Sequence, residues 1–217
     1  MPPGVHVVVK PTRSYHSPRR AAQAQATRAA ILDAAVDLFC TQGYAGTTMQ
    51  AVAAKAGVAV ESVYALASKA RLLELALERT VDDGTDTALA DDDTFRAAMG
   101  AADQRSQLHL FGVLAGRRAR RNAQISRAYV QAAAQDESIA AAWREQERRR
   151  LQDTRLFVAA LAAGGGLRPG LSVDDASRTV WTTCNWYTAW LLYEDDPDRS
   201  EASVAAWYEA TLTTLLL

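Results

Sequence analysis

The sequence predicts an all-α fold, and three observations support this. Alanine dominates the 217-residue chain, proline is scarce after residue 20, and runs of β-branched residues are short. This composition favours helices over strands. Apolar residues also recur at helical spacing, as in Ile31, Ala35, Leu38 and Phe39, which occupy one face of a helix. Glycine and capping residues then mark the ends of the predicted helices.

The composition also indicates the cellular compartment of the protein. The longest uncharged stretch, residues 179–193, contains Thr, Asn, Trp and Tyr and is too short to span a bilayer. The first residues lack the apolar core of a secretory signal. Cys40 and Cys184 lie far apart and form no C-x-x-C motif. We therefore expect a cytoplasmic protein with reduced thiols and no membrane partner.

Charge is distributed unevenly along the chain. Residues 1–80 contain nine Lys and Arg against five Asp and Glu, whereas residues 81–217 contain fifteen against twenty. Residues 1–20, with Pro and Arg interspersed, are predicted to form a flexible basic arm. A basic front and an acidic back suit a protein that presents one end to a polyanion.

Residues 21–82 are predicted to form one domain of short helices. Gly43 should end the first helix, and Thr47 should cap the second in a capping box with Gln50. Gly57 supplies a tight turn, residues 58–66 form a third helix, and Ser68 caps a fourth.

Residues 83–217 form the second predicted domain. The boundary is placed in an acidic segment, residues 82–93, that lacks large apolar side chains. Gly164 to Gly166, Pro169 and Pro197 interrupt the helical pattern. The helices are expected near residues 94–116, 119–134, 137–163, 174–193 and 200–215.

The second and third predicted helices match a helix-turn-helix, in which the second helix of the pair enters the major groove of DNA. Periodicity turns Val63 and Leu66 inward, toward the preceding helix. Val60, Glu61, Tyr64 and Ala65 are left on the outer surface. Helical hairpins with Gly turns are common, so the pattern alone leaves both a DNA-binding and a purely structural interpretation open.

The order of residues in this segment is more specific. It reads Arg28-x-x-Ile31-Leu32-Asp33-Ala34-Ala35-x-x-Leu38-Phe39, Gly43-Tyr44-x-x-Thr47-Thr48, Val52-Ala53-x-x-Ala56-Gly57-Val58, Val63-Tyr64 and Ser68-Lys69-x-x-Leu72-Leu73. Over residues 28–80 it closely resembles the N-terminal domain of the tetracycline-repressor (TetR) family. The resemblance implies a dimeric transcriptional repressor that binds a palindromic operator and is released by a small molecule.

The resemblance also implies DNA-contacting residues. Tyr64 and Lys69 match phosphate-contacting positions, Lys69 with help from a helix N-terminus. Thr48 matches another backbone-contacting position, and Arg28 opens the matching segment. Val60, Glu61 and Ser62 occupy the variable recognition stretch, where Val60 would touch a thymine methyl and Glu61 a cytosine amine. The alternative for Glu61 is a favourable position at a helix N-terminus.

Two departures from the family pattern stand out. Ala59 replaces the usual Ser at the start of the third helix. The usual Tyr-x-x-Phe-x-Ser-Lys becomes Tyr64-Ala-Leu-Ala-Ser68-Lys69, without the aromatic residue and one residue shorter. The alternative function is therefore a helical ligand-binding or scaffold protein with a degenerate helix-turn-helix.

The last two predicted helices each carry an apolar stripe. In the family, such helices pair with their copies in a four-helix dimer interface. The resemblance thus implies a homodimer, and the alternative is an ordinary intrachain core. The candidate interface residues are Val180, Cys184, Thr188, Leu191, Tyr208, Leu212 and Leu215.

All five Trp residues lie in the second domain, which suits either a core or an apolar ligand pocket. Phe111, Tyr129, Trp143 and Trp181 come from four predicted helices and are the candidate ligand-binding residues. They predict a small apolar or aromatic effector. The arginines at 117–121 and 148–150 are interpreted mainly as a solvated face, with an anionic ligand as the alternative.

The sequence does not indicate an enzyme. Its three histidines are His6, His16 and His109, and neither a Gly-x-Ser-x-Gly motif nor a metal-ligand cluster occurs. The triple glycine at residues 164–166 lacks the Lys-Ser/Thr of a phosphate-binding loop. We expect no catalytic residue, no metal and no cofactor.

Overall fold

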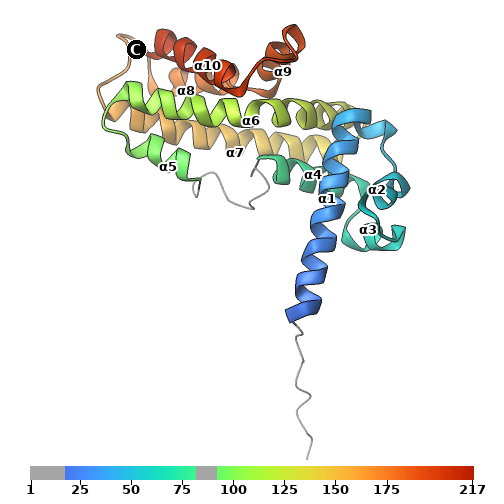
Figure 1. Cartoon of the computed structure of the whole chain (residues 1–217). Coiled ribbons are helices and arrows are strands. Elements are labelled where there is room, and N and C mark those ends of the chain that lie inside the picture. Colours follow the sequence, from blue (N-terminus) through green and yellow to red (C-terminus); the bar gives the residue numbers. More distant parts are fainter. Residues whose placement is uncertain (1–17, 82–91) are drawn as a thin grey trace, which may run out of the picture.

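The computed structural model describes residues 18–81 and 92–217, and within these ranges every regular element is a helix. The predicted all-α fold is confirmed (Figure 1). The helices are α1 (Pro18–Gly46), α2 (Met49–Ala56), α3 (Val60–Leu66), α4 (Lys69–Val81), α5 (Asp93–Gly100), α6 (Gln104–Ala133), α7 (Glu137–Ala163), α8 (Val173–Thr183), α9 (Trp186–Asp195) and α10 (Glu201–Leu216).

The N-terminal end of α1 differs from the predicted arm. Residues 18–20 already belong to α1, so the arm does not extend to residue 20. Residues 1–17 lie outside the described residues, as do residues 82–91, where the domain boundary was predicted. In Figure 1 the first turns of α1 extend beyond the other helices.

Gly43 interrupts α1 as predicted, because its φ of 70° and ψ of 177° are not helical. The predicted cap of α2 is wrong by one residue. Thr48 is the N-cap, and its hydroxyl accepts a hydrogen bond from the Ala51 N–H. Thr47 is buried, and its hydroxyl instead donates a hydrogen bond back to the Gly43 carbonyl of α1.

The turn between α2 and α3 is the predicted one. Gly57 ends α2 with φ 67° and ψ 32°, a left-handed conformation that glycine adopts without steric cost. Ala59 precedes α3 without a side-chain cap. After α3, Ala67 is extended and buried, and the Ser68 hydroxyl accepts a hydrogen bond from the Arg71 N–H at 3.3 Å, as predicted for the start of α4.

The breaks in the second half differ from the prediction. The expected boundary at residues 117–118 does not exist, since α6 runs through it, and the break falls at residues 101–103. Asp103 caps α6 there through the Ser106 N–H. The predicted helix over residues 174–193 is divided at Cys184, where Asn185 caps α9. Short capping side chains decided these ends, whereas the apolar pattern continues across them.

The two halves of the chain share a core. Apolar residues of α1 and α4 pack with Ile125, Ala128, Tyr129 and Ile139 of α6 and α7. Helices α6 and α7 run side by side, and α10 crosses α6 on the other side (Figure 1). None of the described helices is both long and apolar enough to cross a membrane.

Candidate nucleic-acid interface and internal cavity

The outer face of α3 is small and largely uncharged. Tyr64 is 57% exposed and Val63, one position earlier, is completely buried. Glu61 is exposed in the first turn, and Ser62 is half-buried. Val60 was predicted to face outward, but it is half-buried and packs against the core. The predicted inward direction of Val63 is confirmed, and Tyr64 and Glu61 are the side chains that α3 presents.

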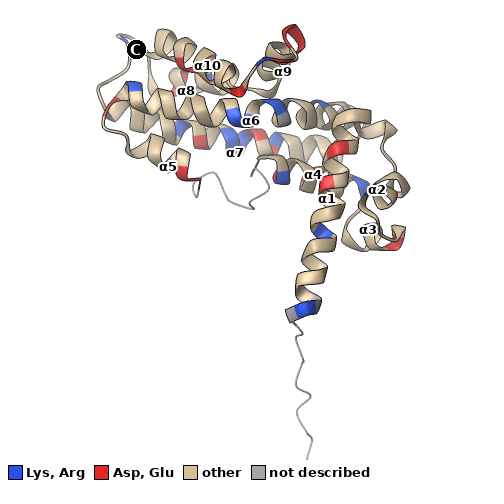
Figure 2. Ribbon diagram, viewed as in Figure 1, with Lys and Arg blue, Asp and Glu red and all other residues tan. Residues whose placement is uncertain are grey.

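Residues on neighbouring elements were also predicted to contact DNA. Thr48 is exposed at the N-terminus of α2, where its hydroxyl already serves as the cap. Arg28 is exposed on α1. Figure 2 shows few charged residues on α2 and α3 themselves. Positive charge near this end therefore comes mainly from α1 and from the start of α4.

Lys69 opens α4 and contacts an aromatic ring. Its Nζ atom lies 4.4 Å from the centroid of the Tyr44 ring, which is a cation–π contact. Burial lowers the pKa of Lys69. Tyr44 in turn stacks on Phe39 of the α1 core, with ring centroids 6.0 Å apart. The side chain of Lys69 is therefore positioned by the fold, beside the free N–H groups of a helix start.

A cavity of about 390 Å³ lies within the second half of the chain. Its walls are stripes at helical spacing on α6 and α7, closed by the α8–α9 junction and by Tyr208 of α10. Leu77 of α4 and Phe95 of α5 also reach it. The apolar lining residues of α6 and α7 include Phe111, Leu114 and Trp143.

The four predicted ligand residues do not converge. Phe111 and Trp143 line the cavity, whereas Tyr129 and Trp181 do not. Tyr129 is 2% exposed and packs in the shared core, its ring 5.2 Å from that of Trp143. Trp181 lines a separate, shallower hollow with Trp143, Trp186 and Tyr187. Sequence spacing identified the right helices but could not tell which aromatic side chains meet.

The arginines beside the cavity are mostly held in ion pairs. Arg118, only 8% exposed, is bound to Asp92 at 2.9 Å, and Arg117 contacts the same carboxylate at 2.6 Å. Arg150 pairs with Glu147 at 2.8 Å and donates to the carbonyl of Trp181. The interpretation of the arginines as a solvated face is therefore wrong for Arg118 and Arg150. It holds for exposed Arg148 and Arg149, which pair with Glu145.

Two further polar residues line the cavity and were missed from the sequence. Asp153 on α7 and Asn122 on α6 both face it. Asp153 lies ten residues after Trp143 on α7, about 80° around the helix axis from it, so the face that carries Trp143 did not indicate it. Asp153 and Glu147 place two carboxylates in the lining, which the four aromatic candidates did not predict.

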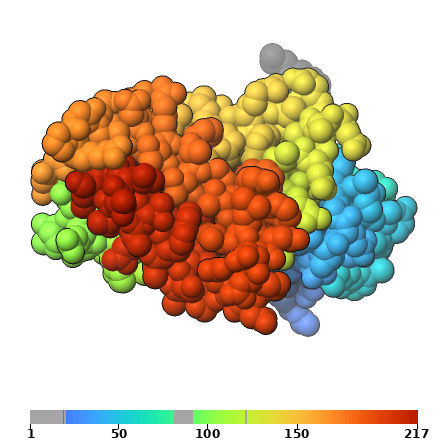
Figure 3. All heavy atoms as spheres, turned by 90° about the horizontal axis from the view of Figure 1, so that it is seen from above, coloured from blue at the N-terminus to red at the C-terminus, as the bar shows by residue number. Residues whose placement is uncertain are grey.

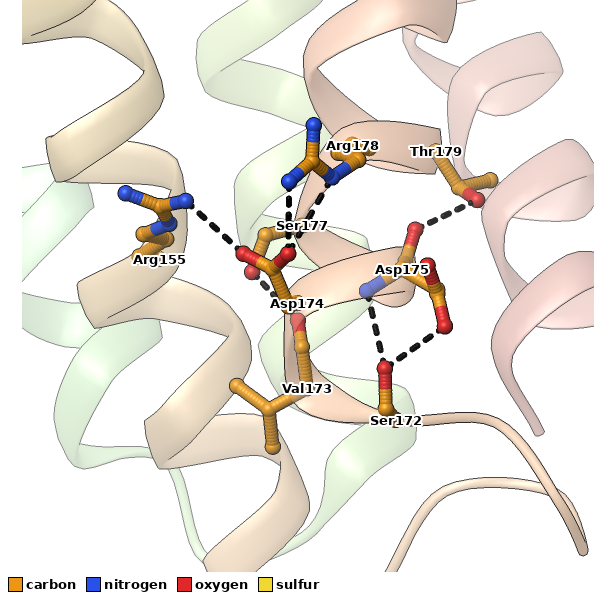
Figure 4. A network of polar contacts seen from close by, with 8 residues as sticks. All are labelled: Arg155, Ser172, Val173, Asp174, Asp175, Ser177, Arg178 and Thr179. Carbon is orange, nitrogen blue, oxygen red and sulfur yellow. Dashed lines mark hydrogen bonds and ion pairs between the residues drawn. The ribbon is translucent and has the colours of Figure 1, made fainter.

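A network of hydrogen bonds and ion pairs connects the start of α8 to α7 (Figure 4). Asp174 accepts from Arg155 of α7 at 2.8 Å and from Arg178 of α8 at 2.7 Å. These hydrogen bonds, that from Arg178 first, lower the pKa of Asp174. Ser172 caps α8 through the Asp175 N–H. The network fixes the direction in which α8 carries Val180 and Cys184 to the cavity.

The predicted dimer residues separate into two groups. Val180, Tyr208 and Leu212 are at most 1% exposed within a single chain, so for them the intrachain alternative is correct. Cys184, Thr188 and Leu215 are half-buried. Leu191 is 46% exposed, and Tyr187 at 49% and Trp207 at 36% accompany it. Figure 3 shows α8 to α10, in orange and red, covering much of one face of the molecule.

This arrangement defines a class of protein: a helix-turn-helix unit packed against a larger helical unit that contains a cavity. Residues 31–75 match the family of bacterial regulatory proteins, tetR family. The expected resemblance is thus confirmed for residues 31–75, which are similar to the N-terminal domain of the TetR family. No curated protein sequence matches the chain.

Solved structures share the fold over nearly the whole chain. A TetR-family transcriptional regulator from Rhodococcus sp. is 16% identical, with a TM-score of 0.66, over 89% of this chain and 100% of that one. A regulator from Saccharomonospora viridis in complex with choline is 17% identical, with a TM-score of 0.67, over 89% and 98%. AibR, in complex with isovaleryl coenzyme A and operator DNA, is 18% identical, with a TM-score of 0.61, over 88% and 97%.

Proposed function

We propose that the chain is a cytoplasmic transcriptional repressor that binds a palindromic operator as a homodimer and releases it when a small molecule occupies the internal cavity. The observation that carries this proposal is the exposed face of α3, with Tyr64 beside the start of α4 at Lys69. We assign no catalytic role to the chain.

The DNA contacts follow from the shape of the N-terminal unit. The outer face of α3 bears Tyr64 and Glu61 and has no competing partner within the described residues other than solvent. Lys69 adds a cation next to a helix N-terminus, a favourable environment for phosphate. In this proposal Arg28 and Thr48 contact the DNA backbone, and Glu61 and Ser62 lie nearest the bases.

A homodimer is supported by exposed apolar surface on α9 and α10. Tyr187 and Leu191 of α9 and Trp207 of α10 are each more than a third exposed, and large apolar side chains are costly to leave in water. Pairing two copies through this face would cover them and present two recognition helices, as a palindromic operator requires.

Communication between the cavity and the DNA-binding unit has a direct route. Leu77 of α4 lines the cavity, and α4 begins at Lys69. Trp143 lines the cavity and packs on Tyr129, which belongs to the core shared with α1 and α4. A ligand that displaces either side chain would favour a different arrangement of α4, and only such differential binding can shift the equilibrium. The ligand-bound solved structures, with choline and with isovaleryl coenzyme A, support an effector role for such a fold.

A gel shift with DNA fragments flanking the gene of this protein tests the proposal. We expect a retarded complex with a fragment that contains an inverted repeat, and competition by the same unlabelled fragment. A chain that binds no flanking fragment and no genomic DNA would favour the alternative, a ligand-binding or scaffold protein with a degenerate helix-turn-helix.

A further inference from the structure

The charged side chains around the cavity differ in whether they have a partner of opposite charge. Each arginine of the lining has a carboxylate partner: Arg118 has Asp92, Arg150 has Glu147, and Arg149 has Glu145. Asp153 differs, because no hydrogen bond or ion pair from any described residue reaches its carboxylate. The cavity thus contains one carboxylate to which no described residue supplies a cation.

Asp153 is also partly shielded from water. Burial raises its pKa, and no neighbouring positive charge acts against that effect. A carboxylate removed from water is costly unless a cation or a hydrogen-bond donor replaces the lost hydration. Its neighbour on α7, Thr154, uses its hydroxyl to donate to the carbonyl of Arg150. Among residues 18–81 and 92–217, none therefore supplies Asp153 with such a replacement.

The rest of the lining suits a cation with an apolar body. Phe95, Phe111, Trp143 and Trp186 contribute aromatic rings, whose faces attract positive charge. The buried Oδ1 atom of Asn122 has no hydrogen-bond partner among the described residues, which makes it a second available acceptor. Asp153 and Asn122 both offer acceptors, and each guanidinium group of the lining is already engaged by a carboxylate.

We propose that the cavity binds an organic cation, a protonated amine on an apolar, ring-containing body, with its charged nitrogen at Asp153. This inference rests on the proposed function only in naming the cavity as the effector site. It adds a positive charge to the predicted small apolar or aromatic effector and keeps its aromatic body.

Three compounds with one naphthalene body test the charge preference. They are N,N-dimethyl-2-(1-naphthyl)ethylamine, a cation at neutral pH, the alcohol 3-(1-naphthyl)propanol, and the anion 3-(1-naphthyl)propanoate. Each is titrated into the full chain by calorimetry without DNA. We expect the amine to bind at least about tenfold more tightly than either of the others, as a charge-assisted contact would provide. This comparison on the unchanged protein needs no variant.

Two charge-matched variants then locate the effect. Asp153→Asn keeps the shape of the side chain and should reduce amine affinity by about tenfold or more, while alcohol affinity changes by less than about threefold. Glu137→Gln removes the same charge from the exposed start of α7, outside the cavity, and should leave all three affinities unchanged.

The contrary outcomes are distinct. Equal binding of amine and alcohol, tighter binding of the propanoate, or no binding of any compound at millimolar concentration would overturn the proposal. So would an amine preference that survives Asp153→Asn. Since DNA is absent, a chain that prefers the amine through Asp153 but binds no operator would refute only the proposed function. A chain that binds operator without that preference would refute only this inference.

Discussion

Gly116 of α6 lies directly against Ala205 of α10. A Cβ atom added at Gly116 would be 2.8 Å from the Ala205 nitrogen and 2.7 Å from the carbonyl oxygen of Glu201. Gly112, one turn earlier, is similarly close to the Ala205 carbonyl oxygen, at 2.8 Å. These glycines allow α10 to approach α6, and α10 carries Tyr208 to the cavity wall.

Gly116→Ala is expected to destabilise the protein. Backbone atoms of α10 would have to move, and overpacking of this kind costs about 1–3 kcal/mol. The gain in helix propensity, about 1 kcal/mol, offsets only part of it. Gly100→Ala is the matched control, since nothing lies within 4 Å of its added Cβ. Urea denaturation should show opposite signs for the two variants, and an equally stabilised Gly116→Ala would contradict the close contact.

The pKa of Asp92 predicts how the stability of the protein depends on pH. Burial acts to raise its pKa, but hydrogen bonds from the N–H groups of Phe95 and Thr94 and the charges of Arg118 and Arg117 outweigh this, so the pKa is lowered. A lowered pKa contributes stability above the unfolded-state value of about 3.9, and this contribution is lost as the pH falls below it.

Asp92→Asn should therefore cost about 1–2 kcal/mol at neutral pH and flatten the loss of stability below about pH 4. Its neighbour Asp93 is 94% exposed and pairs only with Arg96 among the described residues. Asp93→Asn should change stability by less than about 0.5 kcal/mol. Denaturation at several pH values measures both. Identical acid profiles for the Asp92 variant and the unchanged protein would be inconsistent with the ion pairs.

Leu191→Glu tests the proposed dimer face. Leu191 is 46% exposed on α9, so a charge there should be tolerated by the fold and not by an apolar interface. Sedimentation should give about twice 23.5 kDa for the unchanged chain and 23.5 kDa for the variant. Leu156→Glu, at a 60% exposed position of α7, should stay dimeric. If Leu191→Glu is dimeric as well, the interface lies elsewhere.

Lys69→Ala should weaken binding to every DNA sequence. Loss of one phosphate contact reduces the slope of log affinity against log salt by about one unit. Lys69→Arg retains the charge and the cation–π contact with Tyr44, and should keep the slope. Arg105→Ala is the control, because it removes an exposed charge of α6 that lies far along the chain from the helix-turn-helix. Titration by fluorescence anisotropy at several salt concentrations decides, and an unchanged slope for Lys69→Ala would exclude the phosphate contact.

The helices themselves were largely predictable, because apolar periodicity and glycine give local signals. Gly43, Gly57 and Ser68 act in the structure as their residue types suggest. The ends set by Thr48, Asp103 and Asn185 were not found. Each of these ends depends on which side chain accepts a hydrogen bond from a nearby backbone N–H. Alternatives such as Thr47 looked equally suitable.

The sites were less predictable, for a physical reason. A stripe on one helix shows which face is buried but not what covers it, so Val180 and Tyr208 suited a dimer interface as well as the core they occupy. The unpaired state of Asp153 depends on which arginine meets which carboxylate across three helices. No spacing in the sequence contains that information.

The central claim, sequence-specific binding to a two-fold symmetric operator, is tested most directly by selecting duplexes from a random library with the full chain. We predict enrichment of an inverted repeat whose half-sites are separated by about 34 Å, one turn of DNA, or a multiple of it. Recovery of no sequence motif, or of a single motif without two-fold symmetry, would contradict the account.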